Sequence, residues 1–232
     1  MSFNLGSVFP NFLHSIFPEY CCACDHSLLE GEQLICSECN LNLPLTDHSH
    51  NTENDLWVRL ITRMPVSNAL SYMKYNKMGI AQNIVHRFKY QKKEEIGTFI
   101  GKAFGQQLLE NYKNRFDLII PVPLHPNKLK KRGFNQSEVI AKGLSEVLNV
   151  ALEKNIVFRV HENNTQANMD RLDRIQNSTN IFEAKNLELL ENKHVLLVDD
   201  IITTGNTIEN VFESIKDSNF KYFSVATMAH AI

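Results

Sequence analysis

The sequence of 232 residues predicts an α/β fold, a parallel sheet flanked by helices, with a small cysteine-rich module before it. Two observations predict the sheet. Helical and strand patterns alternate from Ala69 onward, and an apolar strand near the C-terminus ends in paired carboxylates. A third observation predicts the module, because all five cysteines fall between Cys21 and Cys39. The chain has no internal repeat that would indicate a solenoid.

Composition limits the class of protein. Hydrophobic residues make up 43% of the chain, enough for a sizeable core, and the formal net charge is −2. That balance argues against general adhesion to nucleic acid, although it allows a local basic patch. No apolar stretch could span a bilayer, and residues 1–18 lack the features of a secretory signal, so we expect a cytoplasmic protein. We expect a module with an apolar N-terminal segment at 1–45, a linker at 46–67 and the main domain at 68–232.

Four cysteines form two Cys-x-x-Cys pairs, Cys21 with Cys24 and Cys36 with Cys39. Two thiolates at this spacing bind one metal from a tight turn, so two pairs fit a closed tetrahedral zinc site of the zinc-ribbon kind. Disulfides are the alternative, but a chain without a secretory signal favours metal. Closed sites are structural, so we expect structural Zn²⁺ that supplies much of the module's folding free energy. Cys22 is interpreted as a spare thiol.

The segment 46–55 is polar and predicts a solvated linker. It contains His48 and His50, for which a second metal site is the alternative interpretation. We interpret both as side chains of a solvated loop. His230, close to the chain end, is interpreted as a surface histidine rather than an acid–base group.

Apolar side chains at helical spacing predict amphipathic helices at 80–89 and 96–109. Lys89 and the cations after it are expected at a solvated helix end, where the helix dipole favours them. The segment 117–123 predicts a short buried strand that prolines terminate.

The most basic segment of the chain, 125–136, predicts a loop between that strand and a helix beginning near Ser137. Cations, a glycine and two amides after a strand end could bind a pyrophosphate or a nucleic-acid backbone. A solvated surface turn is the alternative. The candidate residues are Lys128, Lys131, Arg132, Gly133, Asn135 and Gln136.

Near the C-terminus the apolar strand 195–198 ends in Asp199 and Asp200, and a turn rich in hydroxyls follows. Ligands of open α/β sheets bind at such strand ends, and a turn of this composition can direct backbone N–H groups at a phosphate. A plain helix cap is the alternative, but a cap needs only one such residue. The turn consists of Thr203, Thr204, Gly205, Asn206 and Thr207. Beyond it, 208–216 predicts a helix and 222–228 a closing strand.

This motif resembles the phosphoribosyl pyrophosphate (PRPP) motif of the type I phosphoribosyltransferase family. The resemblance implies that Asp199 and Asp200 hold the ribose hydroxyls with Mg²⁺ nearby, while 203–207 cradle the 5′-phosphate. The Pro-Val-Pro-Leu-His and Arg-Gly-Phe-Asn-Gln blocks within 121–136 resemble a signature of the ComF/GntX family. With the cysteine pairs, the resemblance covers nearly the whole chain. It implies a type I phosphoribosyltransferase fold with a zinc-ribbon-like module.

A polar segment, 160–180, resembles the flexible loop that covers substrate in phosphoribosyltransferases, where a lid excludes water. A plain loop is the alternative. Its spacing of Gln, Arg and Asn matches the ComF family, except that Met169 replaces a leucine. The candidate residues are Gln166, Arg171, Arg174 and Asn177, of which the arginines could meet a departing pyrophosphate.

The ComF resemblance implies a protein that binds PRPP or a related ribose phosphate and acts in natural competence, the handling of imported single-stranded DNA. Single-stranded DNA and competence proteins are then its expected partners. Of three aromatic residues near cations, Phe88, Tyr90 and Phe134, the phenylalanines are expected in the core and could otherwise stack on unpaired bases. One alternative is an active phosphoribosyltransferase that moves the group from PRPP to a nitrogen acceptor. Another is a scaffold that docks a partner through the zinc module.

Overall fold

The computed structural model describes residues 19–161 and 181–231. At its centre lies a five-stranded sheet in the order β1-β7-β6-β2-β3, in which each neighbouring pair is parallel. Its strands are β1 (Asn68–Tyr75), β2 (Leu118–Pro121), β3 (Ala151–Leu152), β6 (His194–Ile202) and β7 (Tyr222–Ala231). Two further strands, β4 (Val157–Arg159) and β5 (Phe182–Ala184), form a separate antiparallel pair. The predicted α/β class is confirmed.

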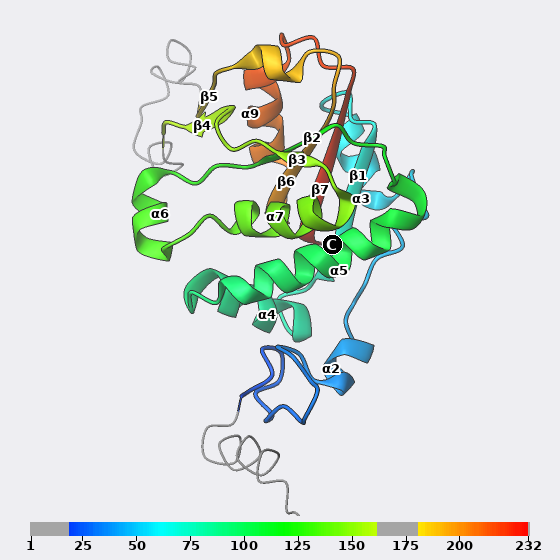
Figure 1. Cartoon of the computed structure of the whole chain (residues 1–232), viewed down its shortest axis with the longest axis vertical. Helices are drawn as coiled ribbons and strands as arrows, with labels where there is room; N and C mark the ends of the chain where they lie inside the picture. The colour runs from blue at the N-terminus through cyan, green and yellow to red at the C-terminus, as the bar shows by residue number, and fades with distance from the viewer. Residues whose placement is uncertain (1–18, 162–180, 232) are drawn as a thin grey trace, which may run out of the picture.

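Helices cover both faces of the sheet (Figure 1). The sheet therefore divides the apolar core into two clusters, one on each face. One face carries α4 (Ile80–Tyr90), α5 (Glu94–Tyr112) and α7 (Gln136–Leu148), and the other carries α3 (Asp55–Ile61) and α9 (Asn206–Ile215). Along β6, Leu196 and Val198 join the first core, while Val195 and Leu197 join the second. Successive side chains of a strand point to opposite faces, so a strand buried on both sides reads as a continuous apolar run.

Glycines allow α5 and α7 to pack closely. A methyl group on Gly143 would lie 2.8 Å from the Thr98 carbonyl oxygen and 2.9 Å from the Gly101 Cα, and a methyl group on Gly101 would overlap the Ile140 carbonyl. The backbones therefore approach more closely than any larger residue permits. This contact fixes α7, whose N-terminal end borders the candidate site.

The regular elements expected at 80–89, 96–109, 208–216 and 222–228 are confirmed as α4, α5, α9 and β7. The loop predicted at 125–136 is wrong in part, because the helix α6 (Pro126–Arg132) occupies it. Proline suits the first position of a helix, the His125 ring accepts a hydrogen bond from the Asn127 amide, and Gly133 ends the helix in the left-handed conformation at φ 91°.

The expectation of a solvated segment at 46–55 is wrong for His48, which is buried, whereas His50 is exposed as expected. Hydrogen bonds to backbone carbonyls join this segment to neighbouring elements. The Asn54 amide donates to the Ala69 carbonyl at 2.9 Å, and the Gln107 amide donates to the Thr46 carbonyl at 3.2 Å. These bonds offset part of the cost of burying the segment, while the Nδ1 atom of His48 has no partner among the described residues.

His230 is also buried, so its interpretation as a surface residue is wrong. It lies on β7, directly beside the helix α3. The same helix places Leu56 and Leu60 in the second core, where both are fully buried. Part of the segment 46–67 is thus packed against the sheet.

The cysteine-rich module lies at the end of the molecule next to α4 (Figure 1). It contains α2 (Ser37–Leu41), its buried apolar residues belong to the first core together with those of α4, and polar contacts also join it to α4. The Asn83 amide donates to the Ala23 carbonyl at 2.7 Å, and Arg87 forms an ion pair with Asp25. The predicted apolar segment within 1–18 lies outside the described residues. Within 19–161 and 181–231, no helix combines the length and apolar character needed to cross a membrane.

Candidate functional site

The strand β6 carries two adjacent carboxylates to the edge of the sheet where its parallel strands end. Asp199 is only 7% exposed, and its Oδ1 accepts hydrogen bonds from the Ser137 hydroxyl at 3.1 Å and from the Asp200 amide at 2.8 Å. The Asp200 Oδ2 lies 2.9 Å from the Lys89 ammonium and 3.8 Å from the Arg132 guanidinium. The two acids therefore differ, since one is buried among hydrogen-bond donors and the other is paired with cations.

Burial, followed by the charge of the neighbouring Asp200 carboxylate, raises the pKa of Asp199 to about 7. Hydrogen bonds from the Asp200 amide and the Ser137 hydroxyl, together with the charge of Lys89, act in the opposite direction. Asp199 consequently changes charge near neutral pH. A cation or a hydroxyl donor bound at this carboxylate would favour its charged form.

The turn after β6 links the carboxylates to α9. Gly205 adopts the left-handed conformation at φ 86° and occupies the N-cap position of α9, which has no side-chain cap. The first amides of a helix lack partners within it and attract anions. A small cavity of about 20 Å³ opens here and includes Asp199 in its lining. All five predicted turn residues also line it, namely Thr203, Thr204, Gly205, Asn206 and Thr207.

Two arginines outside the predicted site hold this turn. We call residues 203–207 the phosphate loop from here on, after the motif that they resemble. The Arg59 guanidinium donates to the carbonyl oxygens of Thr203 at 2.7 Å and Ala231 at 2.9 Å. The Arg63 guanidinium donates to the Thr204 carbonyl at 2.9 Å and to the Asn206 side-chain oxygen at 2.9 Å. No local pattern reveals these contacts, because they span about 140 or more residues of sequence.

The helix α3 also limits the phosphate loop sterically. A methyl group on Gly205 would lie 2.8 Å from the Leu60 Cδ2. Two features favour glycine at this position: its left-handed backbone conformation and the lack of space for a side chain beside Leu60. The contact, together with the two arginines, makes α3 a brace for the phosphate loop.

A second cavity, of about 130 Å³, joins the carboxylates to the basic segment. Asp199, Asp200 and Thr207 line it together with Lys128 and Arg132 of α6. Three further lining residues come from elements that the sequence did not connect with the site, namely Lys89, Ser137 and Arg159. Lys89 was expected at a solvated helix end, but its side chain is only 18% exposed and pairs with Asp200, so that expectation is wrong.

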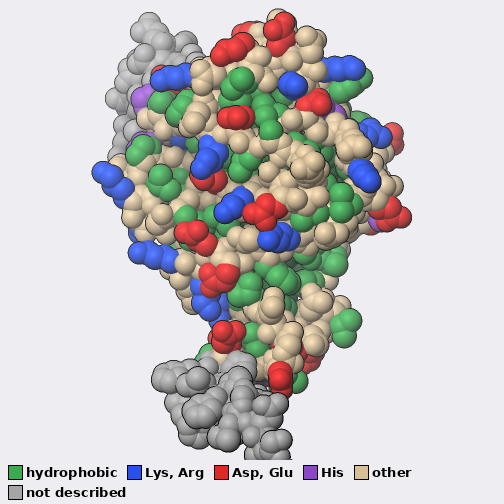
Figure 2. Space-filling model, in the orientation of Figure 1, with side chains coloured by type: hydrophobic (Ala, Val, Ile, Leu, Met, Phe, Trp, Pro, Cys, Tyr) green, Lys and Arg blue, Asp and Glu red, His purple; other side chains and the backbone are tan. Residues whose placement is uncertain are grey.

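A third cavity, of about 350 Å³, shares Lys89, Lys128 and Arg132 with the second. It adds Tyr90 and two lysines, Lys92 and Lys131. Lys and Arg side chains project along the edge of the molecule formed by α6 (Figure 2). The Tyr90 ring is 64% exposed, and the Arg132 guanidinium lies 6.0 Å from its centroid. This cavity thus combines positive charge with an exposed aromatic ring.

The remaining residues of the basic segment hold the backbone in place. The Asn135 amide donates to the Val122 carbonyl at 3.0 Å, and the Asn135 oxygen caps α7 by accepting from the Ser137 amide. Gln136 is buried and accepts a hydrogen bond from Arg132 at 2.8 Å. Gly133 ends α6, as described above. The candidates of the flexible loop, Gln166, Arg171, Arg174 and Asn177, lie outside the described residues.

Core packing is confirmed for both phenylalanines near the cations. Phe88 and Phe134 are buried, and their ring centroids lie 5.6 Å apart. Of the three aromatic residues considered for base stacking, only Tyr90 presents an exposed ring. A stacking surface on this edge would therefore depend on Tyr90.

The four predicted cysteine ligands come together in the N-terminal module. The Sγ atoms of Cys21, Cys24, Cys36 and Cys39 all lie within 4.8 Å of one another, and those of Cys24 and Cys36 are 3.7 Å apart. A tetrahedral zinc ion with Zn–S bonds of about 2.3 Å separates its sulfurs by about 3.8 Å, so the cluster fits zinc. Cys22 lies outside the cluster, and burial raises its pKa to about 12.

Backbone amides further support this cluster. The amides of Ala23 and Cys36 point to the Cys21 sulfur at 3.4 Å and 3.3 Å, and the Cys39 amide points to the Cys36 sulfur at 3.5 Å. Donors around a sulfur stabilise its thiolate form, which is the form that binds metal. The four-cysteine cluster can hold a metal ion such as zinc.

Residues 94–231, more than half of the chain, match the family model described as phosphoribosyl transferase domain. The chain therefore belongs to the phosphoribosyl transferase domain family and has the type I phosphoribosyltransferase fold. DNA utilization protein YhgH of Shigella flexneri is 28% identical over 217 residues, which cover 84% of this chain and 89% of the relative.

Two relatives are named for competence. Competence protein F of Haemophilus influenzae is 29% identical over 153 residues, which cover 64% of this chain and 67% of the relative. Competence protein ComFC of Bacillus subtilis is 25% identical over 189 residues, which cover 81% of this chain and 74% of the relative. The predicted resemblance to the ComF family is confirmed.

Proposed function

We propose that this ComF-like protein binds PRPP, or a related ribose 5-phosphate, together with Mg²⁺. The convergence of two distant motifs on one cavity carries the proposal. Asp199, Asp200 and Thr207 line that cavity with the cations Lys128 and Arg132. A phosphorylated ribose presents both hydroxyls and anionic oxygens, which carboxylates and cations that line one cavity would recognise.

Each part of the site has a role in this proposal. The carboxylates of Asp199 and Asp200 accept hydrogen bonds from the ribose hydroxyls, and with phosphate oxygens they fit the oxygen ligands that Mg²⁺ prefers. The phosphate loop, with its amides at the start of α9, binds the 5′-phosphate. The cations Lys89, Lys128 and Arg132 neutralise the pyrophosphate.

Calorimetry with PRPP and Mg²⁺ tests the assignment. We expect Mg²⁺-dependent binding to the wild-type protein and at least about tenfold weaker binding to Asp199→Asn/Asp200→Asn, because charged hydrogen bonds contribute roughly 1.5–3 kcal/mol each. Asp217→Asn is the control, since Asp217 is exposed at the far end of α9. Absence of PRPP binding to the wild-type protein would overturn the proposal.

The proposed role is in DNA uptake and natural competence, with single-stranded DNA and competence proteins as partners. The names of the relatives support it, and so does the basic cavity that contains Tyr90. Stacking of bases on an aromatic ring between cations gives salt-dependent binding without strong sequence preference. Fluorescence anisotropy with a single-stranded oligonucleotide should show weaker binding for Tyr90→Ala.

Tyr222→Ala is the matched control for that experiment, because Tyr222 is also exposed but begins β7, at the opposite end of the parallel strands from the carboxylates. Equal loss of binding in both variants would argue against a Tyr90 surface. Binding that does not weaken with salt would argue against phosphate contacts altogether.

An active phosphoribosyltransferase is the second candidate, and the pairing of Asp200 with Lys89 favours it. In that reaction the bond between ribose C1 and pyrophosphate breaks, a C1–N bond forms, and the nitrogen nucleophile releases a proton to solvent. The cations around Asp200 would stabilise the charge that develops on the leaving pyrophosphate. Pyrophosphate release in a screen of amines, amides and nucleobases would separate the enzyme from a binding protein.

We also propose that Cys21, Cys24, Cys36 and Cys39 hold one structural Zn²⁺. The proposed domain boundaries are 1–45 for the module, 46–67 for the connection, part of which packs on the sheet, and 68–232 for the main domain. The proposed location is the cytoplasm, whose reducing conditions keep such thiols free to bind metal.

A further inference from the structure

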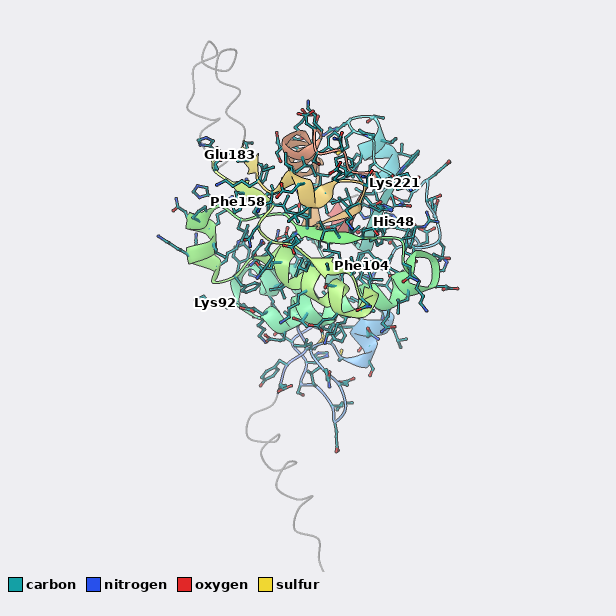
Figure 3. The ribbon with its side chains drawn as sticks, turned by 45° about the horizontal axis from the view of Figure 1, so that its top comes forward. His48, Lys92, Phe104, Phe158, Glu183 and Lys221 are labelled. Atoms are coloured by element: carbon teal, nitrogen blue, oxygen red, sulfur yellow. The ribbon has the colours of Figure 1, made fainter. Side chains whose placement is uncertain are left out.

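A second cluster of metal-binding side chains lies away from the cysteines. The loop before α3 supplies His48, the first turn of α3 supplies Asp55, and the end of β7 supplies His230. The Nε2 atoms of His48 and His230 each lie 3.0 Å from a different carboxylate oxygen of Asp55, and the two ring centroids are 4.9 Å apart. Figure 3 shows His48 on the opposite side of the domain from Lys92, which lines the basic cavity.

Burial makes this cluster unusual. The side chains of His48 and His230 are 2% and 0% exposed, whereas that of Asp55 is 46% exposed. The Nδ1 atoms of both histidines are buried and have no hydrogen-bond partner among the described residues. Buried polar atoms are rarely left without partners, and such atoms call for a specific explanation. A carboxylate accepts hydrogen bonds, so Nε2 of each ring carries the proton in these contacts and each Nδ1 is a buried acceptor without a donor.

We propose that His48, Asp55 and His230 form a site for a divalent transition metal such as Zn²⁺, separate from the four-cysteine cluster. Two imidazoles and one carboxylate form a donor set that zinc prefers, and three protein ligands leave a coordination position open. One ligand atom from each residue lies within 4.8 Å of the others. Modest rotations of the rings would bring the atoms to the separations of about 3.3 Å that bonds of 2.0–2.1 Å require.

The placement of Asp55 gives the ion a route to solvent. Since this carboxylate is about half exposed while both imidazoles are buried, the open coordination position would face outward beside Asp55. Water or an oxygen atom of a small anion could occupy that position. The site would thus be an open one, in contrast to the closed site that four cysteines form.

The ion would tie together elements that also support the phosphate loop. Asp55 lies one turn before Arg59 on α3, and Arg59 donates to the carbonyl oxygen of Ala231, the residue that follows His230. The metal would therefore fix the start of α3 to the end of β7. The inference does not depend on ribose-phosphate binding, because it rests on a different set of residues.

Metal analysis of the zinc-loaded full-length protein after dialysis tests this site. We expect His48→Gln/His230→Gln to hold one zinc per chain fewer than the wild-type protein. His50→Gln is the matched control from the same loop, and it should retain the wild-type zinc content because His50 is exposed and lies outside the cluster. Equal zinc contents in all three proteins would overturn the proposal and leave a purely hydrogen-bonded cluster.

A variant that keeps both buried rings guards against misfolding. Asp55→Asn preserves the shape of a half-exposed side chain and removes the charge of one ligand, so we expect a folded protein with at least about tenfold weaker zinc binding at this site. Circular dichroism would verify the fold. Unchanged zinc affinity in folded Asp55→Asn would contradict the proposal.

Cobalt substitution distinguishes the two metal sites. Cobalt bound by thiolates gives an intense charge-transfer absorption, whereas cobalt bound by nitrogen and oxygen gives only weak ligand-field bands. In a Co²⁺ titration we expect the wild-type protein to show both signals and Asp55→Asn to lose the second while keeping the first. A wild-type titration in which all bound cobalt carries the thiolate signal would exclude the histidine site.

Discussion

The cysteine-rich module and the parallel-sheet domain reach a fixed structure by different means. The sheet domain buries two apolar cores, one on each face of the sheet. In the module, Leu29 and Leu41 are 71% and 85% exposed, and its buried residues, such as Leu28 and Ile35, extend the first core instead of forming a separate one. A segment without a core of its own needs cross-links or metal ligation for stability. The module and the sheet domain should therefore unfold in response to different substitutions.

The largest expected effect is on the module. Cys36→Ser removes one of four zinc ligands, and structural zinc contributes roughly 10–16 kcal/mol to the folding of small zinc modules at neutral pH. We expect the variant to lose zinc and the module to unfold while the sheet domain remains folded, as measured by metal analysis and limited proteolysis. Cys22→Ser should keep its zinc, because Cys22 lies outside the cluster. Full zinc content in Cys36→Ser would contradict the assignment of Cys36 as a zinc ligand.

The sheet domain should instead respond to a cavity. Phe104, labelled in Figure 3, is fully buried on α5. Its ring centroid lies 5.6 Å from that of Tyr72. Phe104→Ala should reduce the free energy of unfolding by about 3–5 kcal/mol, as measured by urea denaturation, without loss of zinc. The exposed Leu41→Ala should change it by less than about 0.5 kcal/mol. A small effect of Phe104→Ala would mean that the core does not determine the stability of this domain.

Within the sheet domain, the site should respond to pH. Ligand contacts that need ionised Asp199 should weaken by about tenfold per pH unit below the pKa of about 7. PRPP titrations between pH 5.5 and 8 would measure this dependence, and Asp199→Asn should abolish it. Affinity that stays constant across this range would show that Asp199 does not contribute through its charge.

The free energy of unfolding should also depend on the protonation of Asp199, but it should decrease as the pH rises, whereas ligand affinity should increase. The unfolded chain releases the Asp199 proton near the ordinary pKa of about 3.9, whereas the folded chain retains it up to about 7. Retention of the proton therefore favours the folded state fully below about pH 4, and this contribution is lost as the pH rises toward 7. The buried acid is thus maintained at the expense of stability.

The smallest expected effect concerns the brace. Arg59→Met removes the hydrogen bonds to the Thr203 and Ala231 carbonyls, and we expect roughly threefold to tenfold weaker ribose-phosphate binding with a loss of only about 1 kcal/mol in stability. Arg115→Ala is the control, because Arg115 precedes β2 at the opposite end of the sheet. Calorimetry and thermal unfolding would separate the two effects. Equal losses in both variants would contradict a specific role of Arg59.

Local patterns predicted those features that depend on nearby residues. The periodicity of α4 and α5 and the apolar run of β6 are visible because each element carries its own burial pattern. The helix α6 was missed, although Pro126 at its start and Gly133 at its end are ordinary helix signals. The expectation of a loop rests on the prolines that end the strand at 117–123, whereas the lysines and arginine that follow are compatible with helix.

Features that depend on long-range packing could not be read from the sequence. Lys89 reaches Asp200 only because α4 and β6 meet in the fold, and the burial of His48 follows from its packing beside His230. The same holds for Arg59, which joins α3 to the phosphate loop across most of the chain. A polar residue in a polar segment carries no signal of burial when its partners are distant.

The strand β1 lies at one edge of the sheet, where only β7 pairs with it among the described residues. The family match begins at residue 94, but β1 precedes it and pairs with β7 along most of that strand's length. A fragment that starts at residue 94 would expose the backbone donors and acceptors of β7, whose side chains are almost all buried. Open, apolar edges recruit other chains. Such a fragment should therefore self-associate in expression trials, so β1 protects the edge of β7 against aggregation.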